Sequence, residues 1–419
     1  CSLGAMTSGF SEEVENQSEV HFSTLRKDFP FFSNNPELIY FDNAATTQKP
    51  RKVIDAVVAF YERFNSNIRS RHYAVGEHVT EAVQKARENV AQFIYAKPKE
   101  IVFVKGTTEA INFVSSSWGA HNLKEGDEIV VSEAEHNANY LPWRMLAEGK
   151  GAILKEMPFN EDGTLDDSFI THKTKFVAVT CSSNVFGEIC NIKEIIEKAH
   201  RVGARVLVDG AQAVPYNSIN VQELGADFFV FSGHKMLAPT GIGVLFIKES
   251  LHEETPPYQY GGGITSSVKE EGIEFLEAPE KYEAGTLPLA EIMGLDAAIS
   301  YLRDDVGFHA LDKHTAKLCE KLITGLEKYP EIKILGEKKR LKEKGHLVSF
   351  FIEGIDSEDI ALVLAENNIA VRSGKMCTHI LDQDVIRVSF YMYNTDGEVE
   401  RFLSVIEDVY EDNYFTKQD

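Results

Sequence analysis

Residues 204–212 read ARVLVDGAQ and residues 226–235 read ADFFVFSGHK, and these two stretches decide the fold. Each begins with a short apolar run and ends in a cluster of polar residues and glycine. Apolar runs of this kind are typical of buried strands in a parallel sheet. The carboxyl ends of such strands meet at one edge, where open α/β sheets bind ligands. We therefore expect the polar side chains of both stretches to share one ligand-binding edge.

Asp209 and Lys235 are the groups of opposite charge at that edge. A buried lysine can form a Schiff base with pyridoxal phosphate, and a carboxylate can pair with the pyridinium nitrogen of this cofactor. A purely structural ion pair would explain the same two residues, because ionic networks also occupy such places. The neighbouring residues favour the cofactor.

The segments VDGAQA at 208–213 and SGHK at 232–235 resemble the two signature segments of fold-type I enzymes that use pyridoxal phosphate, in the class V aminotransferase group. The resemblance extends from about Leu38 to the C-terminal helix. It implies an α/β fold, with a large domain built on a mostly parallel seven-stranded sheet and a smaller α+β domain. We expect an N-terminal arm at 1–32 that packs with the small domain, the large cofactor-binding domain at 33–290, and the small domain at 291–419.

A phosphate site is predicted at KGTTEA, residues 105–110, which follows an expected strand and opens a helix. The free N–H groups and the dipole of a helix N-terminus favour an anion, so we expect Thr107 and Thr108 to bind the phosphate. Ordinary N-capping by Thr107 is the alternative.

The resemblance implies the rest of the cofactor site. It implies that His136 stacks on the cofactor ring and acts as an acid or base, and that Asn184 and Gln212 orient the phenolic side. Ser232 and His234 would bind the phosphate. Thr286, in the segment EAGT, would reach the phosphate of the neighbouring subunit's cofactor, which implies a homodimer with shared sites.

The segment IAVRSGKMC, residues 369–377, would select the reaction. The segment 256–263, with three consecutive glycines, resembles the insertion of SufS-type, group II cysteine desulfurases. Desulfurases of this type carry an Arg and, five residues later, a loop Cys, and Arg372 and Cys377 have this spacing. A guanidinium can hold a carboxylate with two hydrogen bonds, and a thiolate can attack a substrate sulfur. The alternative for Cys377 is a small buried hydrophobe, the usual place of a free Cys. The substrate-binding residues implied by the resemblance are Arg372, Arg387, Asn43 and Ala44.

Two residues before Cys377 depart from the family pattern. Where the family has two histidines, this chain has Lys375 and Met376. We expect the Lys375 ammonium to favour the thiolate form of Cys377 by charge attraction. The following segment, 378–385, is short and lacks the usual Pro.

Composition limits the compartment and the partners. The 419 residues carry a formal net charge of -22, which disfavours nucleic acid and anionic membranes as partners. The five cysteines form no CxxC pair and no zinc pattern, so we expect no metal site and a reducing, cytoplasmic location. No apolar run approaches the length that spans a bilayer. We interpret residues 1–6 as consistent with a cloning scar before a native Met6.

Two segments have simple structural interpretations. Residues 21–32 are expected to form a short helix that ends before Pro30. The charged stretch 337–344 is expected to be a solvated loop. Residues 289–328 carry two helical patterns.

The sequence therefore predicts a cysteine desulfurase with pyridoxal phosphate as its cofactor. It would convert L-cysteine to L-alanine and leave a persulfide on Cys377 for a sulfur-acceptor protein, with iron–sulfur cluster assembly as the expected context. Lys235, Cys377 and His136 are the expected catalytic residues. The alternatives are a selenocysteine lyase acting on L-selenocysteine, a cysteine β-lyase, an aminotransferase, or a non-catalytic nucleotide-binding scaffold. No G-x-G-x-x-G follows the first strand, which counts against the scaffold.

Overall fold

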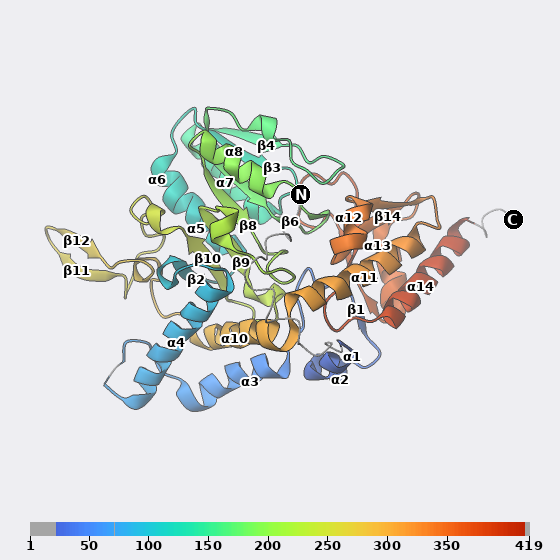
Figure 1. Cartoon of the computed structure of the whole chain (residues 1–419), viewed down its shortest axis with the longest axis horizontal. Coiled ribbons are helices and arrows are strands. Elements are labelled where there is room, and N and C mark those ends of the chain that lie inside the picture. Colours follow the sequence, from blue (N-terminus) through green and yellow to red (C-terminus); the bar gives the residue numbers. More distant parts are fainter. Residues whose placement is uncertain (1–21, 71, 415–419) are drawn as a thin grey trace, which may run out of the picture.

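A seven-stranded sheet forms the centre of the larger part of the molecule (Figure 1). The computed structural model describes residues 22–70 and 72–414. Strand β10 (Gly243–Ile247) runs antiparallel to both of its neighbours, and all other neighbouring strands are parallel. The order is β2 (Ile101–Val104), β10, β9 (Phe228–Ser232), β8 (Arg205–Asp209), β5 (Thr174–Thr180), β3 (Glu128–Ser132) and β4 (Ile153–Met157). The predicted mostly parallel sheet is confirmed.

The continuous apolar runs of the strands exist because both faces of the sheet are covered. Successive side chains of a strand point to opposite faces, so Val208 and Phe229 join one buried cluster and Leu207 and Phe228 join the other. The first cluster is covered by α4 (Ala74–Phe93), α8 (Ile192–Arg201) and α10 (Leu289–Ser300). The second is covered by α5 (Thr107–Val114) and α7 (Leu141–Lys150).

Two glycines permit close packing at the carboxyl edge of this sheet. A Cβ atom on Gly210 would lie 2.2 Å from Cζ of Phe229, so no side chain fits directly after Asp209. A Cβ atom on Gly243 would lie 2.6 Å from Cα of Gly106, the residue before α5. The backbones at this edge therefore approach one another more closely than side chains would allow.

A four-stranded antiparallel sheet forms the smaller part. Its order is β13 (Ile332–Leu335), β14 (Leu347–Ile352), β17 (Val385–Ser389) and β16 (Arg372–Gly374). The helices α11 (Phe308–Leu326), α13 (Ser357–Glu366) and α14 (Asp396–Tyr414) accompany it. A parallel pair of short strands, β1 (Ile39–Tyr40) and β15 (Ile369–Ala370), ties the start of the chain to this part.

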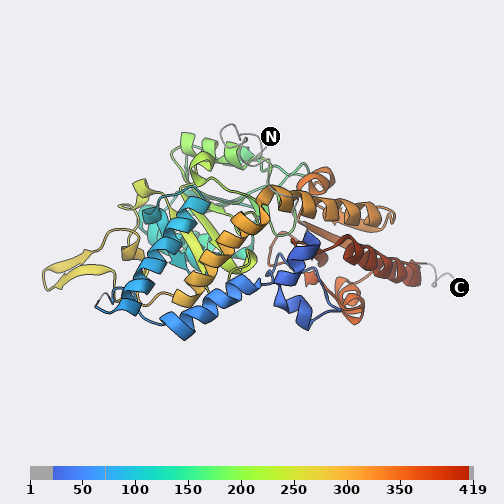
Figure 2. The same ribbon diagram turned by 60° about the horizontal axis from the view of Figure 1, so that its bottom comes forward.

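Helix α10 belongs with the larger sheet. It lies against α3 (Arg51–Ala59) and α4, as Figure 2 shows, and its apolar residues join the same buried cluster. We therefore propose that the boundary between the two parts, expected near residue 290, lies within 301–308.

One local expectation is wrong, and a second is met with an addition. Residues 338–344 form a helix, α12 (Lys338–Lys344), whose first N–H groups are capped by the Glu337 carboxylate and whose lysines pair with Glu327. Helical residues 22–28, formed by α1 (Phe22–Leu25) and the 3-10 turn Arg26–Asp28, end before Pro30 as expected. Pro30 then begins a further helix, α2 (Pro30–Asn34), because a proline at the first position gives up no hydrogen bond.

The described part of the arm contacts the smaller part of the molecule. Arg26 forms an ion pair with Glu398 at 2.8 Å, and the rings of Phe22 and His314 stack at 4.3 Å. The first 21 residues of the predicted arm, including the expected scar, lie outside the described residues.

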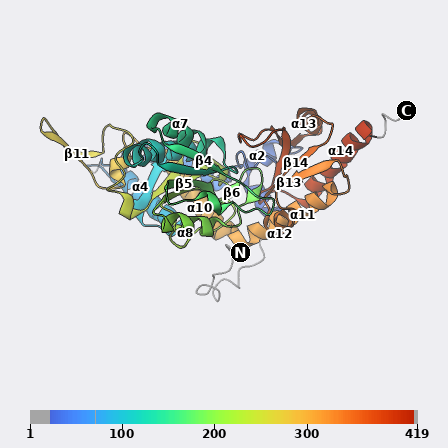
Figure 3. The same cartoon turned by 90° about the horizontal axis from the view of Figure 1, so that it is seen from above.

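A β-hairpin projects from the end of the larger part farthest from the smaller sheet (Figure 3). It consists of β11 (Thr265–Lys269) and β12 (Gly272–Phe275) and follows the glycine-rich segment 256–263. Across the described residues, every helix is too short or too polar to cross a membrane.

Candidate active site

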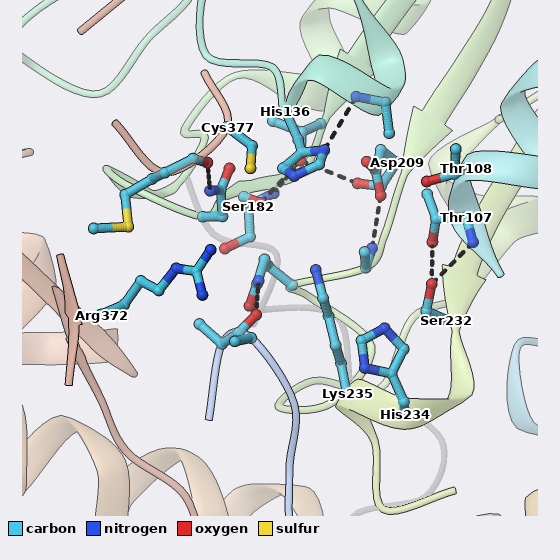
Figure 4. Close-up of a pocket in the computed structure, with 18 of the residues that line it drawn as sticks. Thr107, Thr108, His136, Ser182, Asp209, Ser232, His234, Lys235, Arg372 and Cys377 are labelled. Carbon is cyan, nitrogen blue, oxygen red and sulfur yellow. Dashed lines mark hydrogen bonds between the residues drawn. The ribbon is translucent and has the colours of Figure 1, made fainter. Parts of the chain in front are cut away.

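A cavity of about 270 Å³ lies at the carboxyl edge of the large sheet, between the two parts of the molecule (Figure 4). The strand ends of β8 and β9 supply Asp209 and Lys235, and the smaller part supplies residues from β16, β17 and the loop that follows β16. The predicted site residues that line it are Ala44, Thr107, Thr108, His136, Asn184, Asp209, Gln212, Ser232, His234, Lys235, Arg372, Cys377 and Arg387. Segments far apart in the sequence therefore meet as the strand-end argument predicts.

Asp209 is buried at the base of this cavity, and Lys235 is half-buried there. Burial lowers the pKa of Lys235, while the nearby charge of Asp209 acts in the opposite direction. Burial likewise raises the pKa of Asp209, and the N–H that Ala211 donates to it at 2.9 Å and the charge of Lys235 oppose this shift. The amine is thus more often neutral than in water, which favours attack on a carbonyl carbon.

The turn that carries Lys235 is held through the carbonyl oxygen of His234. This oxygen accepts hydrogen bonds from the Thr47 N–H at 3.1 Å, from the hydroxyls of Thr46 and Thr47, and from Lys49 Nζ at 2.9 Å. Burial lowers the pKa of Lys49 to about 8. The sequence analysis did not single out Lys49, because its role depends on a contact with a segment 185 positions away.

The N-terminus of α5 fits an anion. The Thr107 N–H and hydroxyl meet the Ser232 hydroxyl at 2.9 and 2.8 Å, and a Cβ atom on Gly106 would lie 3.2 Å from the same oxygen. Burial, followed by the charges of Lys235 and Lys49, lowers the pKa of His234 to about 4. A helix N-terminus with hydroxyl and imidazole groups beside it suits a phosphate.

His136 is a neutral imidazole with one defined tautomer. Burial is the main cause that lowers its pKa to about 4, and the charges of Lys235 and Arg387 add to this shift. Its Nδ1 accepts the N–H of Ala138 at 3.1 Å, so the ring proton is on Nε2. The ring lies between Asp209 and Cys377 in Figure 4.

Three residues that line the cavity have a buried polar atom with no hydrogen-bond partner among the described residues: Ser182 Oγ, Gln212 Oε1 and Arg387 Nε. The amide nitrogen of Gln212 is held by the carbonyl of Ala44 at 2.8 Å, which fixes the direction of the free oxygen. Buried polar groups are nearly always paired, so these atoms indicate a polar ligand. Together with the amine, the acid and the anion site, they fit pyridoxal phosphate.

Arg387 and Arg372 reach the cavity from adjacent strands. Arg387 is buried and donates to the carbonyl of Asn184 at 3.1 Å and to Asp42 at 3.2 Å. Burial raises the pKa of Asp42, and the charge of Arg387 opposes this shift. Arg372 is exposed at the cavity rim.

Two expected site residues lie outside the cavity lining. The amide of Asn43 donates to the carbonyl of Ser389 at 2.7 Å and to Asn394 at 3.1 Å, so it joins the two parts of the chain instead of facing the cavity. Thr286 is exposed on the surface, so its predicted role with a neighbouring subunit stays a prediction.

Cys377 is exposed in the loop between β16 and β17. It is therefore not the small buried hydrophobe of the alternative interpretation. Its carbonyl accepts the N–H of Asn137 at 2.8 Å, and the carbonyl of Met376 accepts the Asn184 amide at 2.8 Å. Met376 and Cys377 have φ values of 53° and 55°, a region that non-glycine residues rarely adopt.

Glu135 is a buried carboxyl group that the sequence analysis missed. It accepts hydrogen bonds from Ser132 at 2.5 Å, from the Thr180 N–H at 2.6 Å and from the Asn139 amide at 2.7 Å. Burial raises its pKa to about 8, against the effect of the hydrogen bonds from Ser132 and Asn139. It thereby joins the ends of β3 and β5 to the turn that follows His136. Its position directly before His136 was the available signal.

Comparisons with known proteins agree with this geometry. Residues 39–402 match the family described as aminotransferase class-V. A probable cysteine desulfurase from Halalkalibacterium halodurans is 42% identical over 91% of this chain and 96% of its own length. A cysteine desulfurase from Shigella flexneri is 38% identical over 92% and 97%. The apo structure of a cysteine desulfurase from Thermococcus onnurineus NA1 superposes with a TM-score of 0.88 at 35% identity, covering 94% of this chain and 98% of the other. The chain therefore belongs to the aminotransferase class V family.

Proposed function

We propose that this protein is a pyridoxal phosphate-dependent cysteine desulfurase that converts L-cysteine to L-alanine and retains the sulfur as a persulfide on Cys377. One observation carries the proposal: an exposed cysteine lines the same cavity as a half-buried lysine and a buried aspartate. Relatives that carry the name cysteine desulfurase support it.

The residues at the base of the cavity would hold the cofactor. Lys235 would attach it, Asp209 would face its ring nitrogen, and His136 would lie on its ring. Thr107, Thr108, Ser232 and His234 would surround the phosphate, with Asn184 and Gln212 on the phenolic side. When bound, pyridoxal phosphate withdraws electrons from the α-carbon of an amino acid, which makes the bonds at that carbon and its neighbour easier to break.

The two arginines would orient the substrate. A carboxylate placed between Arg372 and Arg387 would receive charged hydrogen bonds, and this would direct the substrate amine toward Lys235. We infer that Ala44, rather than Asn43, borders the substrate, because only Ala44 lines the cavity. The Lys235 amine would then move protons at the α- and β-carbons of the substrate.

The sulfur step needs no outside oxidant. The Cys377 thiolate attacks the substrate sulfur, the bond between that sulfur and the β-carbon breaks, and a sulfur–sulfur bond forms. The electron pair of the broken bond goes to the β-carbon, which takes a proton and becomes the methyl group of alanine. Lys235, which lines the same cavity, would supply this proton.

Three further expectations belong to this proposal. The persulfide would pass to a sulfur-acceptor protein in the cytoplasm, in the service of iron–sulfur cluster assembly. The enzyme would act as a homodimer in which Thr286 of one protomer completes the phosphate site of the other. Thr286 is exposed, as a residue with that role must be in a single protomer.

The decisive experiment compares wild type with Cys377→Ala and with Cys190→Ala, a matched control at the partly exposed Cys190. With L-cysteine, wild type and the control should give alanine and a protein persulfide in equal amounts, and Cys377→Ala should give neither. A Cys377→Ala variant that still releases sulfide from L-cysteine would point to a β-lyase. One that remains active only on L-selenocysteine would point to a selenocysteine lyase.

A further inference from the structure

His379 lies two residues after Cys377 and contacts two residues of the larger part, Tyr140 and Glu156. We propose that these three side chains, named here the clasp, hold the Cys377 loop closed over the cavity, and that the loop opens to release sulfur when the clasp parts. In this scheme His379 is a positioning residue. The proposal rests on the proposed function, since it gives the Cys377 loop two states that serve the two steps of sulfur transfer.

The geometry of the clasp joins two rings through one carboxylate. The rings of His379 and Tyr140 stack with centroids 3.9 Å apart and an interplanar angle of 20°. The Tyr140 hydroxyl donates to Oε1 of Glu156 at 2.6 Å, and Nε2 of His379 lies 3.3 Å from Oε2 of the same carboxylate. Tyr140 is buried beside the start of α7, and Glu156 is on β4, so His379 meets a fixed surface of the larger part.

The loop needs such contacts because its backbone is unfavourable. Both Met376 and Cys377 have positive φ values, which a free loop of non-glycine residues would rarely keep. Before the thiol, the Met376 side chain packs with Val185 of the larger part, and its carbonyl bonds to Asn184. After the thiol, the clasp provides one side-chain contact with the larger part, and Leu381 joins the same buried cluster as Met376 and Val185. Cys377 is thus anchored on both sides.

The exposure of the clasp suits a contact that opens. The side chains of His379 and Glu156 are 26% and 41% exposed. By comparison, the side chains of the buried Arg87–Glu283 pair are 7% and 4% exposed. Water and salt weaken an exposed pair far more than a buried one. The stacked rings and the half-exposed pair therefore stabilise the closed loop only weakly, so that it can open.

Closing and opening serve different steps of the reaction. With the clasp closed, the Cys377 carbonyl stays bonded to the Asn137 N–H, next to His136 and the cavity. This places the thiol for attack on the substrate sulfur. With the clasp open, that hydrogen bond breaks, and the persulfide can leave the cavity and meet an acceptor.

The test uses the full-length holoenzyme and four variants. His379→Ala removes the stack and the ion pair, His379→Phe keeps only the stack, and Tyr140→Phe removes only the hydroxyl. His172→Ala, at an exposed histidine elsewhere on the larger part, is the matched control. Two readouts require no turnover: hydrogen exchange of the 136–140 segment, and the rate at which iodoacetamide alkylates Cys377, followed by mass spectrometry of its peptide.

We expect His379→Ala to alkylate about three- to ten-fold faster than wild type, the change expected from loss of one stacked pair and one exposed ion pair. The Asn137 N–H should exchange faster by a similar factor. The alkylation and exchange rates of His379→Phe and Tyr140→Phe should lie between those of wild type and His379→Ala. The rates of His172→Ala should match those of wild type. With L-cysteine, kcat for alanine should fall at unchanged KM, while sulfide release from the preformed persulfide to dithiothreitol should accelerate.

Equal exchange and equal alkylation in His379→Ala and wild type would overturn the clasp, whatever the activities are. Failure of the proposed function looks different, because Cys377→Ala would then still release sulfide from L-cysteine or remain active on L-selenocysteine. A fall in kcat without any change in exchange or alkylation would also contradict the clasp and would assign His379 a different effect.

Discussion

Arg372 and Arg387 lie directly opposite one another on β16 and β17. Their side chains therefore leave the same face of the smaller sheet and enter one cavity. Asp42 pairs with Arg387 at 3.2 Å, but Arg372 makes no ion pair within the described residues. Like charges placed opposite each other across strands destabilise a sheet. An anion bound between the two arginines, such as the carboxylate of the substrate, would offset the repulsion between their charges.

Arg372→Ala should therefore weaken substrate binding more than it slows the chemical step. We expect KM for L-cysteine to rise by about ten- to hundred-fold, because hydrogen bonds to charged groups contribute about 1.5–3 kcal/mol. Steady-state alanine formation measures this. Arg372→Lys should recover only part of the loss, because a lysine lacks the planar pair of donors. Because the variant also removes the repulsion with Arg387, its melting temperature should be equal or higher. A clear drop in melting temperature with unchanged KM would make Arg372 a structural residue.

Lys235→Ala should abolish covalent cofactor attachment. The wild-type protein should be yellow after addition of pyridoxal phosphate, and the variant should lack the visible absorption band of the attached cofactor. Lys193→Ala, at an exposed lysine of α8, is the control and should keep the band. Absorption spectra before and after gel filtration measure this. A band of full strength in Lys235→Ala would refute the attachment site.

Glu135 should make stability fall as pH rises. Its pKa is about 8 in the folded protein against an ordinary value of 4.5, so the folded state keeps a proton that the unfolded state loses. Its contribution to the free energy of unfolding is therefore fully present below about pH 4.5 and is lost as pH rises toward about 8. The free energy of unfolding, measured with urea at pH 5, 6.5 and 8, should depend less on pH in Glu135→Gln than in wild type. Parallel curves for the two proteins would show that Glu135 is ionised in the fold throughout.

Thr286 offers a test of shared sites. Light scattering should show a dimer, and Thr286→Ala should release cofactor about ten-fold more readily if it loses one hydrogen bond to a charged phosphate. A hybrid dimer of Thr286→Ala and Lys235→Ala protomers contains one site with both residues intact, provided that Thr286 acts across the interface. Such hybrids should recover cofactor attachment at one site of the two. Mixed samples that remain as weak as Thr286→Ala alone would place Thr286 within its own protomer's site.

The strand-end residues could be predicted because their signals are local. The apolar runs before Asp209 and Lys235 and the hydroxyl residues after β2 each occupy a few consecutive positions, and parallel pairing brings their ends together without further information. The helix α12 was missed because two of its lysines pair with Glu327, the residue after α11, and no local pattern reveals this contact. His379 was missed for the same reason, since its partner Glu156 is 223 positions away.

Asn43 was expected to bind the substrate, but it lies outside the cavity lining. It stands beside Ala44 in a turn at 43–45, and only the hydrogen bonds of its amide to Ser389 and Asn394 decide which of the two residues faces the cavity. The sequence likewise did not predict the pairing of β16 with β17, which brings the two arginines together.

The reversed strand β10 has a consequence for how the cofactor site could change over time. Its neighbours end at the catalytic edge, but β10 begins there, with Gly243 paired to Ser232 and Val104. Because this glycine touches the backbone of Gly106, it acts as a spacer that sets how far the phosphate helix stands from the lysine turn. A single added methyl group at that spacer would shift the helix, and Thr107 and Thr108 with it, without replacing any cofactor-contacting side chain. A substitution at Gly243 would thus change the affinity for the cofactor, although Gly243 does not line the cavity.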